Sequence, residues 1–499
     1  MMKEEHMKAF GHCFMGTTLL LLVLMYGNAF AISLDDEGTL EITGKIQSRI
    51  SLRMSDSEGY TSPDTPVGHM VQQRNLAQIE LNQLLLRQSQ DTPEVKYHIK
   101  GRFLYEGVYD YGPDEYQETR ENNPDVIDEF KKDEDLWECY LDYSKGPWFF
   151  RVGKQNLSWG ETDVYQLMDR INPIDNTFGG AFEDLDDRRI PLWMMRGTYN
   201  FGNVGPVSSF TAEGFINPGW SGQEVAPLSP YGTPYAYPSS ASSVLVRVHE
   251  PEETFQNSRM GIRLQGVLAD NFNVSIAHYQ TICDTPSAIL TFDPTLTGYV
   301  AQDLTYETEQ VTGATASFYE SHIDAIVRAE AAWFWDEPVF IPEVNLPALF
   351  GVYETGKIPT TNMLRYMVGL DKSLWMRFIN DTSMINCYFQ YFAEYYPDYD
   401  DRQCLAVEDY STGGFIEQKR YEQKVTLITS TTYMSGTLTP QIVFAYDPRG
   451  AMMYIPSIEK SFHPWIFKIA YYGIVGDEDV SVGILKDRQQ LSMQATVVF

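Results

Sequence analysis

The sequence predicts an all-β protein: a single antiparallel barrel of about 18 strands, or about 16, that crosses a membrane. Three observations support this fold class. Long segments alternate apolar and polar residues strictly, aromatic residues make up 14% of the chain with 32 tyrosines, and the segments between strands alternate short and long. A barrel closed on itself leaves no unpaired backbone edge facing lipid, which is what strands need to span a bilayer.

The N-terminus has the pattern of a secretory signal peptide over residues 1–31. Two lysines precede an apolar run at 17–25, and residues 29–31 offer a small-x-small cleavage site. The apolar run is shorter than the about 20 residues that a membrane-spanning helix needs. We therefore expect cleavage after Ala31 and a mature barrel over residues 32–499.

Residues 39–54 set the strand pattern. One face is apolar and the other is polar, and the segment fits the about 9–11 residues of a tilted transmembrane strand. The polar face of this first strand carries Lys45, Arg49 and Arg53. The same alternation recurs at 95–106, 259–268, 323–335, 363–371 and 465–471, and more weakly at 207–216, 273–281 and 451–459. A charged residue repeated between large apolar neighbours indicates a wet lumen inside an apolar wall.

The chain closes with an alternating strand that ends at Phe499. A C-terminal aromatic residue on such a strand is typical of barrels in a Gram-negative outer membrane. We expect the protein in that membrane, in contact with the lipid bilayer and lipopolysaccharide, and recognised by the barrel-insertion machinery through this last strand.

The connections indicate which end of the barrel faces outward. Short ones lie at 145–147, 202–206, 269–272, 319–322 and 434–436, and long ones at 110–135, 159–189, 217–256, 282–305, 336–360 and 394–419. Short periplasmic turns and long external loops are the usual asymmetry. Both termini are then periplasmic and the strand number is even.

The composition excludes several function classes. A formal net charge of −31 argues against a nucleic-acid partner, which would need a basic face. None of the cysteines forms a CxxC pair, so no metal, redox or other cofactor site is predicted, and a bridge between Cys283 and Cys404 has no support. No nucleophile elbow, HExxH or phosphate loop is present, so we expect no enzyme. The acidic stretch 110–138 either binds divalent cations, bridging to lipopolysaccharide, or is a solvated loop.

Inside the predicted lumen, basic residues outnumber acidic ones. Rings of such charges tune which ions pass a pore. The alternative is that they form ion pairs that hold the wall together. The predicted pore-lining residues are Lys45, Arg49, Arg53, Lys100, Arg102, Glu106, Arg263, Arg328, Glu330 and Arg365.

One long connection differs from the others, because alternation stops after Gln155. Val164, Leu167, Met168 and Ile171 follow helical spacing, and Pro173 then breaks any helix. Apolar residues would not be stable in a solvated loop, so we expect 159–189 to fold inward as a constriction or plug. The alternative is a compact external cap. The predicted constriction residues are Trp159, Glu161, Asp163, Asp169, Arg170, Asn172 and Asp175.

We further expect the charges of this segment to meet the basic wall of the lumen, since an unpaired buried charge costs several kcal/mol. The wall residues are Lys45, Arg49, Lys100 and Arg102, and the available acids are Glu161, Asp163, Asp169, Asp175 and Asp184. Arg170 has Glu80 or Glu106 as alternative partners.

The same region resembles a known family. The motifs at 153–155, 158–161 and 171–175, followed by Pro191, resemble the domain-of-unknown-function family 1302 of proteobacterial outer-membrane proteins. Segments 364–366, 369–371 and 485–490 are also similar to that family. Lys154 stands where the family commonly has Arg, which weakens any bidentate contact there. Members are often encoded near RND-type exporters, which implies passage of hydrophobic compounds.

The sequence thus favours an outer-membrane channel, or a transport-associated barrel, that passes small hydrophobic or anionic solutes. The alternative is a non-conducting scaffold that docks an exporter or a periplasmic redox partner. No CxxCH haem motif is present, so any electron carrier would be a separate chain.

Overall fold

The structure is a computed structural model, and it describes residues 32–33, 39–56, 65–177, 182–219, 224–230, 232–236, 245–292, 300–352, 354–409, 414–477, 480 and 483–499. The predicted signal peptide at 1–31 lies outside these residues. The wall is built from 18 strands, as predicted. They are β2 (Leu40–Arg53), β3 (Met70–Leu86), β4 (Glu94–Glu106), β5 (Lys132–Lys145), β6 (Trp148–Gln155), β7 (Leu192–Val204), β8 (Val207–Asn217), β10 (Arg259–Leu268), β11 (Phe272–Ile282), β14 (Thr308–Glu320), β15 (Ala325–Pro338), β16 (Thr360–Leu374), β17 (Ile385–Tyr395), β20 (Tyr421–Ser430), β21 (Leu438–Asp447), β22 (Ala451–Phe462), β23 (Trp465–Gly476) and β24 (Gln490–Val498).

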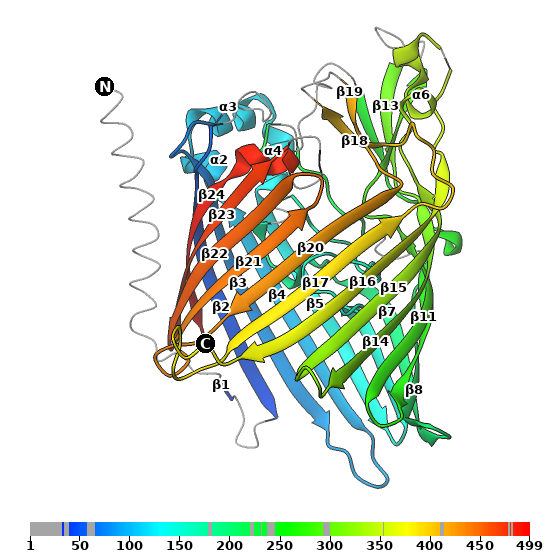
Figure 1. The fold of residues 1–499 in the computed structure, drawn as a ribbon, viewed down its shortest axis with the longest axis vertical. Helices are drawn as coiled ribbons and strands as arrows, with labels where there is room; N and C mark the ends of the chain where they lie inside the picture. The colour runs from blue at the N-terminus through cyan, green and yellow to red at the C-terminus, as the bar shows by residue number, and fades with distance from the viewer. Residues whose placement is uncertain are drawn as a thin grey trace.

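Each wall strand pairs antiparallel with the next one in this order, and β24 pairs with β2 to close the barrel (Figure 1). Lys45 lies opposite Val498 in that closing pair. A short strand β1 (Ile32–Ser33) adds to β2. The weakly alternating segments β8, β11 and β22 are full members of the wall. The predicted antiparallel barrel and its higher strand count are therefore confirmed.

Short turns lie at one end of the barrel and long excursions at the other (Figure 1). The long excursions carry α2 (Val108–Tyr111), α3 (Asp114–Asn122), α4 (Pro124–Phe130), the small sheet β9 (Leu245–His249), β12 (Ser287–Phe292) and β13 (Val300–Thr305), the hairpin β18 (Cys404–Asp409) and β19 (Gly414–Glu417), and α6 (Pro342–Asn345) with η3 (Pro347–Phe350). Strand β2 begins and β24 ends at the short-turn end. None of the helices in the described chain has the length and apolar content to cross a bilayer.

The acidic connection between β4 and β5 was expected as a loop, and in the structure it folds into α2, α3 and α4. Val108, Tyr109, Tyr116 and Ile127 form a small core there with Val71. The acids are partly compensated within the same segment, since Asp110 lies 3.0 Å from the Lys131 ammonium and also pairs with Arg120.

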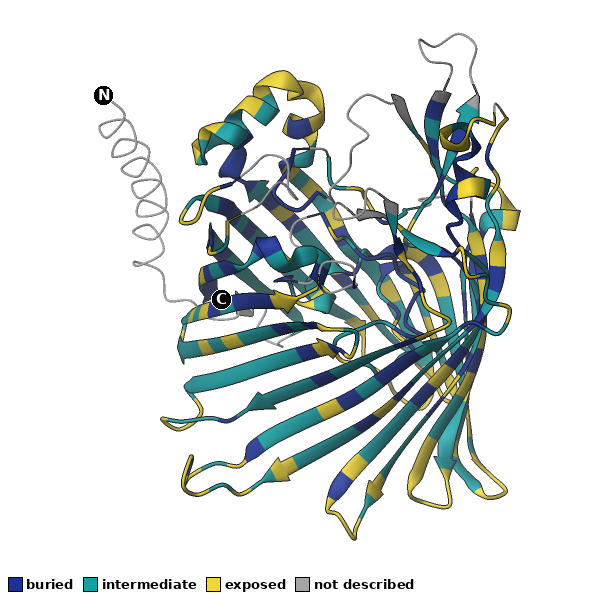
Figure 2. Ribbon diagram, turned by 45° about the horizontal axis from the view of Figure 1, so that its top comes forward, coloured by how far each residue is buried: buried dark blue, intermediate teal, exposed yellow. Residues whose placement is uncertain are grey.

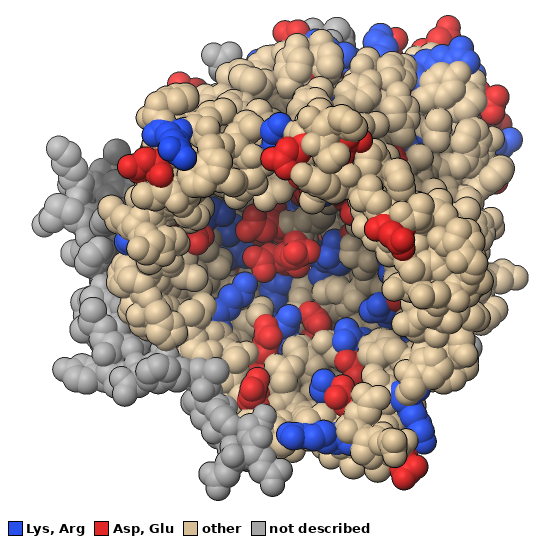
Figure 3. Space-filling view, turned by 60° about the horizontal axis from the view of Figure 1, so that its bottom comes forward, with Lys and Arg blue, Asp and Glu red and all other residues tan. Residues whose placement is uncertain are grey.

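The two faces of the wall have opposite chemistry. Many residues of the wall strands are exposed (Figure 2), and Ile99, Phe150 and Ile469 are among the exposed large apolar side chains. Charged side chains gather instead inside the hollow of the barrel, as the view onto the short-turn end shows (Figure 3). The period-two alternation of each strand produces this separation, because successive side chains point to opposite faces.

Aromatic residues cluster on the outer face near both ends. At the short-turn end, the ring centroids of Trp148 and Tyr199 are 4.5 Å apart and those of Trp465 and Phe467 are 5.9 Å apart. Toward the other end, the Tyr421 hydroxyl lies 2.7 Å from the hydroxyls of Tyr366 and Tyr391. Such belts are typical of the two interfaces of a membrane-spanning barrel.

The last residue takes part in barrel closure. The Phe499 amide donates to the Gly44 carbonyl at 3.0 Å, and the Gly44 amide donates to the Phe499 carbonyl at 2.8 Å. A Cβ at position 44 would lie 2.5 Å from the Phe499 ring and 2.6 Å from the Gln78 carbonyl oxygen. Gly44 therefore leaves room for the terminal aromatic ring and the neighbouring backbone.

We predict that Gly44→Val destabilises the barrel by about 1–3 kcal/mol, because the added side chain overpacks this closure. Gly101→Ala is the matched control, since nothing lies within 4 Å of a Cβ built at that position of β4. The measurement is the urea midpoint of refolding into lipid, read from the heat-dependent gel mobility of the folded barrel. Equal midpoints for the two variants would contradict the prediction.

Candidate functional site

The chain between β6 and β7 is described over two segments, which lie inside the barrel. Its described parts, 156–177 and 182–191, are called the insert below. Leu157, Trp159, Leu167, Met168 and Ile171 are buried in one core with inward side chains of neighbouring strands from β7 to β17. These wall residues include Leu192, Met194, Phe215, Tyr279, Val311, Phe334, Met363, Met367 and Phe392. On the other side, Phe182 packs on Tyr472 of β23 at 5.3 Å between ring centroids. The insert therefore touches the wall on opposite sides.

The helical spacing of Val164, Leu167, Met168 and Ile171 does not form a helix. The insert has a single short helix, α5 (Leu185–Arg188). The physical reason is that wall side chains bond the backbone of 161–170. The Glu330 carboxylate accepts the Glu161 amide at 2.5 Å and the Met168 amide at 2.7 Å.

Further wall side chains continue this pattern. Gln390 accepts the Asp163 amide at 3.1 Å, the Thr281 hydroxyl donates to the Arg170 carbonyl at 3.0 Å, and the Tyr279 hydroxyl donates to the Met168 carbonyl. A buried backbone needs such partners, and here the lumen supplies them in place of helical hydrogen bonds.

Asn172 holds the two ends of the insert together. Its Oδ1 accepts the Leu157 amide at 2.8 Å, and its Nδ2 donates to the Ile190 carbonyl at 2.8 Å and to the Gln155 carbonyl at 3.3 Å. The side chain is almost completely buried. A side chain that can both donate and accept is required at this position.

Arg170 lies in a buried acidic pocket. Its Nη1 is 3.1 Å from Glu309 and 3.3 Å from Glu337, so the expected pairing with Glu80 or Glu106 is wrong. Glu80 lies 3.4 Å from Lys100, and Glu106 accepts the Gln73 amide at 2.6 Å. At Arg170 the insert therefore contacts β14 and β15, and not the strands that carry Glu80 and Glu106.

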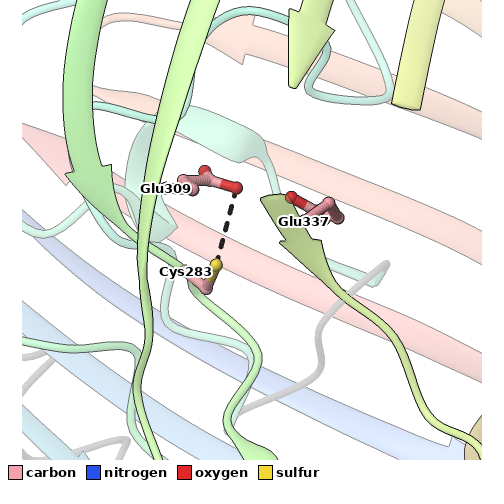
Figure 4. Close-up of side chains that lie close together, drawn as sticks. All are labelled: Cys283, Glu309 and Glu337. Atoms are coloured by element: carbon pink, nitrogen blue, oxygen red, sulfur yellow. Dashed lines mark hydrogen bonds between the residues drawn. The ribbon is translucent and has the colours of Figure 1, made fainter. Parts of the chain in front are cut away.

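Cys283 completes this pocket, with its Sγ 3.5 Å from a Glu309 oxygen (Figure 4). One ligand atom each of Cys283, Glu309 and Glu337 lies within 4.8 Å of the others, the spacing of a metal site. Arg170 already supplies positive charge between the carboxylates. Burial alone would lower the pKa of Arg170, but Glu309 and Glu337 outweigh burial and raise it well above its ordinary value. The arrangement is best described as a buried salt-bridge cluster of Arg170 with Glu309 and Glu337. The cysteines of the described chain, Cys404 included, are free thiols.

The predicted basic wall of β2 and β4, joined by Arg74 of β3, meets a different pair of acids from those expected. Glu183 is 3.0 Å from Arg49 and also pairs with Arg74, and the Asp187 carboxylate is 3.3 Å from Lys45. The backbone carbonyl of Asp187 accepts from Arg102 at 3.0 Å. These contacts attach the second half of the insert to the wall.

The acids named from the sequence have other partners. Asp163 pairs with Arg328 at 2.5 Å, Asp169 pairs with Arg189 inside the insert at 2.5 Å, and Asp175 accepts the Thr177 amide at 2.8 Å. Asp184, also among them, faces the cavity described below.

The remaining basic residues predicted to line the lumen also form ion pairs or hydrogen bonds. The distances are 3.0 Å from Lys100 to Glu138, 3.0 Å from the Arg53 Nη1 to the Asp487 carbonyl, 3.3 Å from Arg263 to Glu213, 2.8 Å from Arg328 to Asp371 and 3.3 Å from Arg365 to Glu394. Trp159 donates from Nε1 to Glu213 at 2.5 Å, and Arg263 lies over the Trp159 ring. Most of these cations are thus paired within the wall or with the insert.

Sequence reasoning missed Glu183, Asp187, Glu213, Glu309 and Glu337. Glu213 and Glu309 share the inward parity of their strands, so the alternation carried a signal for them. Glu337 does not share it, because a β-bulge between Phe334 and Glu337 shifts the register of β15. Glu183 and Asp187 lie in the insert, where alternation has stopped and no periodic signal exists.

Salt-bridge partners, and not exposure to solvent, keep these insert acids charged. Burial raises the pKa of Glu183, but Arg74 and Arg49 outweigh it and hold the pKa below its ordinary value. Burial likewise opposes ionisation of Asp187, and Lys45 with Arg102 outweighs it to lower that pKa.

A closed antiparallel barrel with an apolar outer wall, two aromatic belts and a charged interior defines an outer-membrane β-barrel protein with porin-like architecture. The chain belongs to the family described as protein of unknown function (DUF1302), whose model matches residues 13–499. The resemblance drawn from the insert motifs is therefore confirmed. No curated relative of the chain was found.

Solved structures of similar fold are remote in sequence. Acinetobacter baumannii OccAB1 is 9% identical with a TM-score of 0.47, over 94% of this chain and 98% of that one. Pseudomonas aeruginosa OccK9 is 8% identical with a TM-score of 0.46, over 92% and 97%. Salmonella typhi OmpF, solved in complex with daunomycin, is 9% identical with a TM-score of 0.42, over 94% and 100%.

We predict that Glu183→Gln loosens residues 182–191 while the barrel stays folded. Removing one partner of a buried pair costs about 3–5 kcal/mol, which corresponds to at least about 100-fold more frequent opening of this segment. Amide hydrogen exchange of the segment measures the change. Asp186→Asn is the matched control, because the Asp186 carboxylate is exposed and, among the described residues, forms its ion pair with Arg189. Equal protection in both variants would show that Glu183 does not attach the insert.

Acid should have the same effect as this substitution. Because the pKa values of Glu183 and Asp187 are lowered in the folded protein, their attachment is fully present above the ordinary carboxyl pKa of about 4 and is lost as pH falls through the lowered values. Normalised hydrogen-exchange protection of 182–191 should stay constant from about pH 8 to about pH 5 and decrease below about pH 4. A decrease centred near neutral pH would contradict this assignment.

Proposed function

We propose that the protein is a channel for small solutes across the outer membrane and that the insert is its constriction. The observation that carries this proposal is a cavity of about 600 Å³ inside the barrel. It lies between the insert and the inward faces of β16, β17, β20, β21 and β22. The insert thus fills one part of the lumen and leaves another part open, and a barrel of this strand number is wide enough for an aqueous path.

The lumenal charges have a specific place in this proposal. Since Lys45, Arg49 and Arg328 are paired with acids of the insert, they hold the constriction in position and do not act as free anion-attracting groups. Selectivity for small anionic or hydrophobic solutes is then set by the side chains that face the open part of the lumen. This solute class is part of the proposal.

A second candidate function is a non-conducting scaffold. The continuous core between the insert and β7 to β17 favours it, because buried apolar side chains of the insert and the wall pack together in that half of the lumen. In this case the barrel would dock an RND-type exporter or a periplasmic partner. In both cases we propose that the barrel-insertion machinery recognises the strand that ends at Phe499.

Planar-bilayer conductance distinguishes the two functions. We predict that a variant in which a short Gly-Ser linker replaces residues 162–187 conducts several-fold more current than the wild type, because the constriction is gone. Heat-dependent gel mobility confirms that each protein is folded, and Asp186→Asn, which leaves the anchors in place, should conduct as the wild type does. Folded protein that conducts neither with nor without the insert would reject the channel and leave the scaffold.

A further inference from the structure

The inward face of β20, β21 and β22 departs from the polar pattern of the lumen. Ile428 lies opposite Val443, and Val443 lies opposite Ile455, so the three form one row across neighbouring strands. All three line the cavity and are only partly buried. In the next row toward the external end, Ala445 and Met453 are buried and apolar, and Thr426 of β20 is the polar member. Apolar side chains left partly exposed inside a wet lumen indicate a surface for an apolar ligand.

The insert forms the facing side of this cavity. Val164 and Tyr165 line it, and Tyr165 makes an edge-on contact with Phe392 of β17 at 5.5 Å between ring centroids. The cavity volume of about 600 Å³ falls in the range of small-molecule sites, which is about 300–1,000 Å³. The shape is therefore that of a pocket with two apolar sides.

A cation stands at one end of this apolar surface. Lys424 has the same inward parity as Ile428. It lies four residues before Ile428, toward the external end of β20, and the two positions are about 13 Å apart along the strand. Its ammonium lies 5.1 Å from the centroid of the Tyr165 ring. Among the described residues it has no carboxylate within ion-pair distance, because the neighbouring Glu394 and Glu422 pair with Arg365 and Arg449.

Five acids also line the cavity, and most are neutralised. Asp163, Glu183 and Glu394 pair with arginines of the wall. Asp184 and Asp284, which also line the cavity, are not members of these pairs. They are the groups that would favour a cationic ligand instead, so a cationic probe belongs in the test.

We propose that this cavity binds an amphipathic carboxylate, with an apolar body of about 10 Å on the Ile428–Val443–Ile455 row and its single acidic group on Lys424. This proposal names a solute class for the proposed function. It rests on that function because the solute must be able to enter the lumen. The ammonium of Lys424, held next to an aromatic face, supplies the charged contact, and burial of the apolar body supplies most of the affinity.

The test uses three probes with the same apolar body: 2-naphthoate, 2-naphthalenemethanol and (2-naphthylmethyl)trimethylammonium. Binding to the full-length barrel in lipid nanodiscs is measured by calorimetry, with empty nanodiscs subtracted. We predict that 2-naphthoate binds at least tenfold more tightly than either other probe. Lys424→Gln should reduce naphthoate affinity to that of the alcohol. Val443→Asn should weaken all three probes.

Lys468→Gln is the matched control, because Lys468 is an inward lysine of β23 that does not line this cavity. It should leave naphthoate affinity unchanged. The proposal is overturned if the ammonium probe binds as tightly as the carboxylate, if Lys424→Gln leaves the preference intact, or if none of the probes binds.

Conductance of the same preparations separates this proposal from the channel function. A conducting barrel that does not bind naphthoate refutes the ligand site and keeps the channel. Naphthoate binding with the predicted Lys424 dependence in a barrel that never conducts supports the site and refutes the channel.

Discussion

Every part of this structure depends on one constraint: a backbone polar group that faces lipid or a dry interior must have a hydrogen-bond partner. The wall satisfies the constraint by closing, so that β24 pairs with β2 and the terminal Phe499 pairs with Gly44. The insert satisfies it differently. Its backbone lacks regular structure over 161–170, and side chains of Glu330, Gln390 and Tyr279 on the wall bond its amides and carbonyls. The wall thus determines the path of a segment that has no secondary structure of its own.

This constraint explains which features the sequence could predict. Strand existence, inward parity and the inequality of the two barrel ends all follow from local alternation and from the position of turn residues, so they were predictable. Even the weakly patterned β8, β11 and β22 followed the rule. The helices α3 and α4 were not predicted, since their stability comes from contacts of Tyr116 and Ile127 with Val71 of β3, a long-range packing that local charge density hides.

The interior of the barrel was predictable as a kind of surface but not as a set of contacts. Lys45, Arg49 and Arg328 indeed face inward and meet acids of the insert. Which acids they meet depends on how the insert crosses the lumen, and one-dimensional spacing contains no such information. Arg170 shows this most clearly. Its partners Glu309 and Glu337 lie on β14 and β15, whereas the expected partners Glu80 and Glu106 lie on β3 and β4.

The position of Arg170 also has a consequence for biogenesis. Glu309 and Glu337 face each other across β14 and β15 and are buried, and two like charges in such a place repel unless a cation separates them. That cation comes from a segment synthesised well before either strand. The pairing of these two strands at their external ends is therefore favoured energetically once the insert is seated. Part of the energy that holds the later half of the wall closed thus comes from inside the lumen, from a residue in the first half of the chain.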